Sequence, residues 1–226
     1  MPIYKHVNKD FFKIWTPNMA YILGFFAADG YMTLNKRGAH FWGIEITDGI
    51  LLKRIKEAIN SDHKIGLRPV RGREKQLYRL QIGSKEMFND LLSLGFTGGK
   101  TKRLAVPEVP AVYFRDFVRG YFDGDGNVWF GHVHRDGPKD SLAILTVFTS
   151  SSRKFLDELR RRLRILDLIR GSVKKGVGNY YRLTYSIRSS MKLYDFIYNH
   201  PILVSGEDLF LTRKKEVFDR YLTMRS

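Results

Sequence analysis

Residues 19–30 read MAYILGFFAADG, and residues 115–126 read RDFVRGYFDGDG. Each stretch carries apolar residues at helical spacing and ends in Asp-Gly, and the two aspartates, Asp29 and Asp125, stand 96 positions apart. Two copies of one pattern in a single chain indicate an internal duplication. The segments around the two stretches test that idea.

The expected helices and strands follow the same order around both stretches. Thr16 and Pro17 mark the start of the first helix, because Thr is a common capping residue and Pro favours the first helical position. The first copy predicts a helix over 17–28, strands over 31–36 and 40–47, a helix over 48–60, strands over 64–73 and 75–82, and a helix over 84–95. The second copy predicts a helix over 111–124, strands near 127–134 and 142–149, a helix over 151–166, strands near 170–175 and 180–188, and a helix over 189–199.

This order predicts an α+β fold of two pseudo-symmetric αββαββα repeats. The triplet Tyr-Arg-Leu at 78–80 recurs at 181–183 and supports the duplication. The predicted domains are the first repeat at 1–96, a basic linker at 97–110, the second repeat at 111–200 and a C-terminal helical extension at 201–226.

The charge of the chain points to a polyanionic partner. Its 226 residues include 39 Lys and Arg against 23 Asp and Glu, which gives a net charge of +16. Nucleic acid is the usual partner of so basic a protein. The chain has no Cys, which excludes disulfides and thiolate zinc sites. Without a long apolar run or a secretory signal, we expect a soluble intracellular protein with no membrane partner.

Small residues line one face of each of the two expected helices. Gly24 and Ala28 stand four positions apart in the first, and Gly120 and Gly124 in the second. Residues at this spacing share a helix face, and small residues there let two helix backbones approach closely. We therefore expect the helices to pack through Gly24 and Gly120, with the two Asp-Gly aspartates emerging side by side.

Two neighbouring carboxylates repel each other unless a cation joins them. Carboxylates together with phosphate oxygens and water form a typical magnesium site, and such a site supports hydrolysis of a phosphodiester. A single Asp-Gly after a helix would indicate only a helix end. Two matching copies on a chain of charge +16 favour a metal site formed by Asp29 and Asp125.

The segments Ile22–Gly30 and Val118–Gly126 resemble the two motifs of a single-chain LAGLIDADG homing endonuclease. The resemblance extends over nearly the whole chain, since the αββαββα repeat is the domain of that family. It implies two antiparallel sheets forming a saddle over DNA, with the motif helices packed at the central interface. It also implies a monomer with internal pseudo-twofold symmetry that binds double-stranded DNA.

The resemblance further implies roles for particular residues. Asp29 and Asp125 would hold the divalent metal, joined by the backbone carbonyls of Ala28 and Gly124. The metal would be Mg²⁺, with Mn²⁺ able to substitute and Ca²⁺ supporting binding more than cleavage. A lysine that organises water near the scissile phosphates would be Lys100 in the first half and Lys214, or its neighbour Arg213, in the second. The polar residues at the start of the second helix of each repeat would be Asp48 and Ser150.

The expected strands divide into a core face and an open face. Met32, Leu34, Tyr78, Leu80, Ile82, Tyr181, Leu183, Tyr185 and Ile187 are expected to point inward. Side chains of the types that read base edges are expected on the open faces, namely Thr33, Asn35, Arg37, Arg79, Gln81, Tyr180, Arg182, Thr184, Ser186 and Arg188. Phosphate contacts are expected from Arg71, Arg73, Lys174 and Lys175.

These observations predict a magnesium-dependent homing endonuclease that cuts both strands of a long, nearly asymmetric DNA site. Two alternatives remain open. A splicing maturase would use the same basic surface to hold intron RNA. A catalytically inactive DNA-binding regulator would keep the fold, although the presence of both aspartates argues against it.

Overall fold

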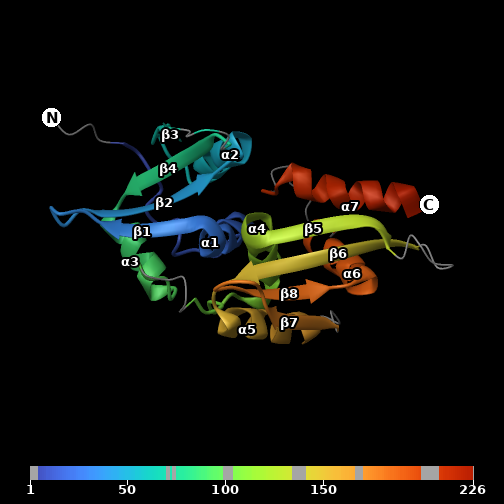
Figure 1. Ribbon diagram of the computed structural model, residues 1–226. Helices are drawn as coiled ribbons and strands as arrows, with labels where there is room; N and C mark the ends of the chain where they lie inside the picture. The colour runs from blue at the N-terminus through green and yellow to red at the C-terminus, as the bar shows by residue number, and fades with distance from the viewer. Residues whose placement is uncertain are drawn as a thin grey trace. The chain divides into compact units, whose positions relative to one another are not determined.

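The computed structural model describes residues 5–69, 72, 75–98, 104–133, 141–165, 170–199 and 209–225 (Figure 1). The first repeat contains α1 (Pro17–Asp29), β1 (Gly30–Leu34), β2 (His40–Ile46), α2 (Gly49–Ala58), β3 (Ile65–Arg68), β4 (Leu77–Gly83) and α3 (Lys85–Ser93). The second contains a short 3-10 turn η2 (Ala111–Tyr113), α4 (Phe114–Asp125), β5 (Gly126–Val133), β6 (Ser141–Ser150), α5 (Arg153–Ile165), β7 (Gly171–Lys175), β8 (Tyr181–Tyr185) and α6 (Ile187–Tyr198). Helix α7 (Thr212–Arg225) lies in the predicted C-terminal extension.

The two repeats have the same sheet topology, which confirms the predicted duplication. The strand order is β1-β2-β4-β3 in the first sheet and β5-β6-β8-β7 in the second, and every pair of neighbours is antiparallel. In both repeats the first strand begins immediately after the motif helix, at Gly30 and at Gly126. The end of each motif helix is therefore tied directly to the edge of a sheet.

The described residues divide into two compact units. The first unit contains the first repeat together with residues 107–124 and Leu209. The second contains residues 104–106, the chain from Asp125 to the end of α6, and α7. Helix α4 thus packs with α1 in the first unit. The second unit begins at Asp125, the last residue of α4.

Local capping explains why the first-repeat helices begin where the sequence predicts. The hydroxyl of Thr16 accepts a hydrogen bond from Met19 N at 3.0 Å, and Pro17 occupies the first turn of α1. The carboxylate of Asp48 accepts from Leu51 N at 2.8 Å at the start of α2. Ser84 caps α3 in the same way. Each cap satisfies a backbone N–H that has no partner inside the helix.

Each sheet buries one face under its helices. In the first unit Trp42 of β2 is fully buried, with its ring 5.2 Å from that of Phe12 and 6.0 Å from that of Phe26 in α1. In the second unit Phe148 and Leu183 are buried beneath α5 and α6. Leu80, Ile82, Leu183 and Tyr185 are buried as predicted.

Several predicted boundaries and orientations were wrong. Strand β8 ends at Tyr185 rather than 188, because Ser186 occupies the capping position of α6 and Ser190 donates its hydroxyl to Tyr185 O at 3.0 Å. Helix α5 begins two residues later than predicted, because the hydroxyl of Ser152 accepts from Phe155 N. Leu34 was expected inward, but it ends β1 and is 57% exposed.

Candidate active site and nucleic-acid interface

The helices α1 and α4 pack through their glycines, as the sequence predicts. A Cβ added to Gly24 would overlap Phe117 O and lie 2.9 Å from Tyr121 N. A Cβ added to Gly120 would overlap Tyr21 O and lie 2.9 Å from Phe25 N. The two contacts mirror each other, so each backbone rests against the other with no room for a side chain.

The close packing continues to the ends of the two helices. A Cβ on Gly124 would overlap the side chain of Ala28 and lie 3.3 Å from Asp29 Oδ2. The Asp29 carboxylate therefore lies beside the last turn of α4. Asp29 is exposed and Asp125, the final residue of α4, is partly exposed. Both residues thus reach the surface of the protein.

The electrostatics at the Asp29 carboxylate favour a cation. The C-terminal end of a helix carries a partial negative charge from its unpaired carbonyls. Asp29 lies at such an end of α1 and beside that of α4, and neither helix has a basic residue in its last turn. No three His, Asp or Glu side chains form a metal-binding cluster in the described ranges. A cation here would take further ligands from backbone carbonyls, water or a bound anion.

A buried polar network lies behind the glycine contacts in the first unit. Tyr21 donates its hydroxyl to Asp123 Oδ2 at 2.8 Å. Arg119 pairs with Asp116 at 2.8 Å, and its Nε donates to Leu209 O at 2.9 Å. Asp116, Arg119 and Asp123 are nearly fully buried. The sequence analysis missed this network, although three charged residues inside a predicted buried helix were a signal for it.

Lys214 occupies a defined position in the second unit. Helix α7 lies along β5 (Figure 1), and Lys214 near its start is only 6% exposed. Its Nζ donates to Gly126 O at 2.6 Å, the carbonyl directly after Asp125. The predicted counterpart, Lys100, lies outside the described residues.

The other predicted auxiliary positions take part in local backbone hydrogen bonds. Asp48 caps α2 through Leu51 N. Ser150 is the last residue of β6, is buried, and accepts from Ser152 N at 3.1 Å. The structural equivalent of Asp48 is therefore Ser152, which caps α5, and the sequence alignment of the two repeats was shifted by two positions there.

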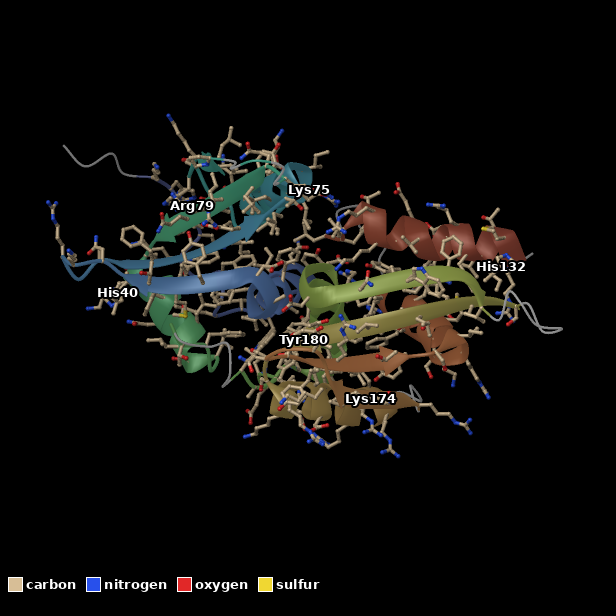
Figure 2. The ribbon with its side chains drawn as sticks, in the orientation of Figure 1. His40, Lys75, Arg79, His132, Lys174 and Tyr180 are labelled. Carbon is tan, nitrogen blue, oxygen red and sulfur yellow. The ribbon has the colours of Figure 1, made fainter. Side chains whose placement is uncertain are left out.

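The first sheet turns one face away from α1, α2 and α3, and we call it open face A. Strand alternation and register place on it Tyr31, Thr33, Phe41, Gly43, Glu45, Gly66, Arg68, Arg79 and Gln81. Thr33, Arg79 and Gln81 thus lie where they were predicted, and Figure 2 shows Arg79 on β4. Arg71 and Arg73 lie outside the described residues.

Asn35 and Arg37 lie in the turn between β1 and β2 rather than on a strand. The side-chain oxygen of Asn35 accepts from Arg37 N at 2.9 Å and from Ala39 N at 2.8 Å. Asn35 therefore stabilises the turn, in contrast to the free side chain that alternation predicted. Arg37 is exposed at the tip.

The equivalent surface of the second sheet, open face B, carries Asn127, Trp129, Gly131, Leu145, Val147, Thr149, Ser172, Lys174, Arg182 and Thr184. Figure 2 labels Lys174 on β7 and Tyr180 before β8. The guanidinium of Arg182 lies 5.1 Å from the centre of the Tyr180 ring. Lys175 is paired with Tyr181 and points to the other face by alternation.

Ser186 and Arg188 belong to the start of α6, so the strand-alternation argument does not place them on open face B. Trp129, which the sequence analysis did not single out, is 46% exposed on that face. Its indole covers Gly131, where a Cβ would lie 2.7 Å from the ring. Open face B therefore combines an apolar part on β5 and β6 with a basic part on β7 and β8.

Comparison with solved structures shows the same fold along nearly the whole chain. A lysine-to-alanine variant of I-SmaMI matches with a TM-score of 0.60 at 16% identity, covering 93% of this chain and 92% of that one. I-SmaMI bound to uncleaved DNA in the presence of calcium ions matches with a TM-score of 0.57 at 15% identity, covering 94% and 92%. The LAGLIDADG meganuclease I-AabMI bound to uncleaved DNA matches with a TM-score of 0.58 at 16% identity, covering 93% and 90%.

A family comparison agrees with the structural one. Residues 113–200 match the model of the LAGLIDADG-like domain. No curated protein sequence matches the chain. No helix among the described residues has the length and apolar character that a membrane span requires. The chain thus carries a LAGLIDADG-like domain in its second repeat, and its two-repeat fold is that of the single-chain LAGLIDADG homing endonucleases.

Proposed function

We propose that this chain is a site-specific double-strand DNA endonuclease of the homing type, acting as a monomer on a long, nearly asymmetric target. The observation that supports this best is the position of the Asp29 carboxylate beside Gly124, the residue that precedes Asp125. The glycine packing of α1 and α4 holds this arrangement in place. The basic residues of the open faces and the charge of +16 suit a DNA partner.

Asp29 and Asp125 would hold divalent metal, together with the backbone carbonyls of Ala28 and Gly124. The donor set fits a hard cation, because it offers carboxylates and helix-terminal carbonyls without a basic residue in either last turn. Mg²⁺ is the proposed ion, with Mn²⁺ as a substitute and Ca²⁺ supporting binding more than cleavage. When bound there, such an ion would supply Lewis-acid stabilisation of the phosphodiester oxygens.

The protein's own residues fix the geometry of the proposed site. Gly24 and Gly120 set the spacing of the two helices. Lys214 holds the carbonyl of Gly126 and so fixes the backbone that follows Asp125. We assign Lys214 a positioning role, while a role for Lys100 in organising water stays a prediction.

The open faces would bind the DNA. Thr33, Arg79, Gln81, Arg182 and Thr184 have side chains that read base edges in the major groove. Lys174 and the exposed Arg37 suit phosphate contacts, which position the duplex without reading its sequence. Tyr180 would support Arg182 through their ring-to-guanidinium contact.

Cleavage of a randomised plasmid library tests the proposal. The wild-type protein with Mg²⁺ is expected to cut a recurring site, recovered by sequencing the ends, and EDTA is expected to abolish cutting. Asp29→Asn and Asp125→Asn should each abolish double-strand cleavage while binding of the site survives. Asp62→Asn, an exposed aspartate after α2, serves as the matched control and should cut normally. Cleavage of both strands at the wild-type rate by either motif variant would refute the mechanism.

A further inference from the structure

Open face A carries a carboxylate at its centre, where a surface that binds DNA would be expected to be basic. Glu45 of β2 stands opposite Arg79 of β4 in the strand register. Its Oε1 lies 3.7 Å from Arg79 Nη1, and its Oε2 lies 3.3 Å from Arg68 Nη1 on β3. One carboxylate on β2 therefore pairs with guanidinium groups from the next two strands of the sheet, β4 and β3.

The exposed fractions of the three side chains show how far each one extends from the sheet. The Glu45 side chain is 25% exposed, whereas those of Arg79 and Arg68 are 51% and 62% exposed. The carboxylate thus lies low against the sheet, and the guanidinium groups extend above it. Gly66 pairs with Arg79 across β3 and β4, so no side chain from that position competes with Arg79 for space on the face.

Tyr31 bounds the cluster on the side of β1. Its hydroxyl lies over Gly43, where an added Cβ would be 2.6 Å away. Burial raises the pKa of Tyr31, while the charge of Arg79 lowers it and the charge of Glu45 raises it. Glu45 therefore pairs with Arg79 from the side of the sheet, and Tyr31 occupies the neighbouring part of open face A over Gly43.

Stability alone gives a weak reason for this arrangement. Exposed ion pairs contribute only about 0–1 kcal/mol. A negative charge on a face that meets phosphates also weakens DNA binding at every sequence. A carboxylate is useful there if it orients an arginine toward the bases and keeps that arginine away from the DNA phosphates. Repulsion between the carboxylate and the phosphates then disfavours DNA sequences on which the arginine has no matching base.

We propose that Glu45 is a specificity-determining residue, which positions Arg79 to read a guanine in the major groove. This inference rests on the proposed function. The Arg79 guanidinium would donate two hydrogen bonds to guanine O6 and N7, the commonest specific arginine contact to DNA. Glu45 acts through Arg79 and need not touch the base itself, and Arg68 completes the neutralisation of the carboxylate.

The test compares Glu45→Gln with Glu57→Gln, which removes the same charge from an exposed position on α2. Fluorescence anisotropy would measure binding to the target recovered from the cleavage library, to every single-base-pair variant of it, and to an unrelated duplex. We expect Glu45→Gln to lose about tenfold discrimination at one G·C pair and to bind the unrelated duplex more tightly than Glu57→Gln does. Arg79→Gln should relax the same base pair.

The possible results distinguish a failure of the Glu45 proposal from a failure of the endonuclease proposal. If Glu45→Gln gave the same base preferences as Glu57→Gln, or if Arg79→Gln relaxed a different base pair, the inference would be overturned while the endonuclease proposal stood. If the wild-type protein bound every duplex equally, both would fail. A thermal melt of each variant checks that an altered preference belongs to a folded protein.

Discussion

The packing of α1 against α4 makes Gly120→Ala a severe test of the proposed geometry. The added methyl group would overlap Tyr21 O, with Tyr21 C at 2.8 Å and Phe25 N at 2.9 Å. All three atoms belong to the backbone of α1, so no side-chain rotation relieves the overlap. The helices must therefore move apart, and contacts along their shared face are weakened.

The size of the effect follows from two opposing terms. Overpacking a well-packed interface costs about 1–3 kcal/mol, and a rigid backbone partner puts this site at the upper end of that range. Replacing glycine by alanine inside a helix stabilises the helix by about 1 kcal/mol, which offsets part of this cost. The free energy of unfolding should thus fall by about 2 kcal/mol, which lowers Tm by about 4–8 °C in a chain of this length.

Thermal melts followed by circular dichroism measure this change, with Gly66→Ala as the matched control. A Cβ on Gly66 would meet only Arg79 O at 3.9 Å, so its Tm should move by no more than about 2 °C. The separation of the helices should also reduce DNA cleavage by Gly120→Ala at temperatures where it remains folded. A Tm equal to that of Gly66→Ala would refute the close packing of the two motif helices.

Three further predictions address groups outside the glycine contacts. Tyr21→Phe removes the hydroxyl that donates to the buried Asp123, so chemical denaturation should show a loss of about 1–2 kcal/mol, and an unchanged midpoint would count against the buried network. Lys214→Met removes the donor to Gly126 O, and we expect slower cleavage with little change in DNA affinity; equal cleavage rates would argue against a positioning role. Hydrogen bonds from Arg161 and Arg162 of α5 lower the pKa of Glu158 from 4.5 to about 2. The ionised Glu158 therefore stabilises the folded protein fully above pH 4.5, and this stabilisation is lost as the pH falls toward 2. The difference in Tm between the wild type and Glu158→Gln should therefore be smaller at pH 3 than at pH 6, and a constant difference would contradict this assignment.

Features that depend on a few neighbouring residues were predictable from the sequence. The caps at Thr16 and Ser84 place their helices because each hydroxyl bonds to an N–H only three residues away. The duplication was visible because both copies carry the same periodicity and the same Asp-Gly ending. The glycine contact between α1 and α4 followed from small residues at helical spacing, since few other reasons favour glycine inside a helix.

Strand ends and contacts between strands, which the alternation of polar and apolar residues does not encode, were not predictable. The alternation of polar and apolar residues continues past Tyr185, so the sequence pattern did not reveal that Ser190 ends the strand by bonding back to it. The Glu45 cluster requires the order β2-β4-β3, which places residues 45, 68 and 79 together. Leu34 is 57% exposed although alternation places it inward, and it is the last residue of the edge strand β1.

Diffraction from crystals of the protein with its DNA target and Mn²⁺ would examine the proposed metal site directly, through the anomalous signal of manganese. We expect peaks about 2.1 Å from carboxylate oxygens of Asp29 and of Asp125, each also close to a DNA phosphate. Ordered DNA on the open faces with no manganese at either carboxylate would contradict the metal-dependent cleavage proposed for this chain.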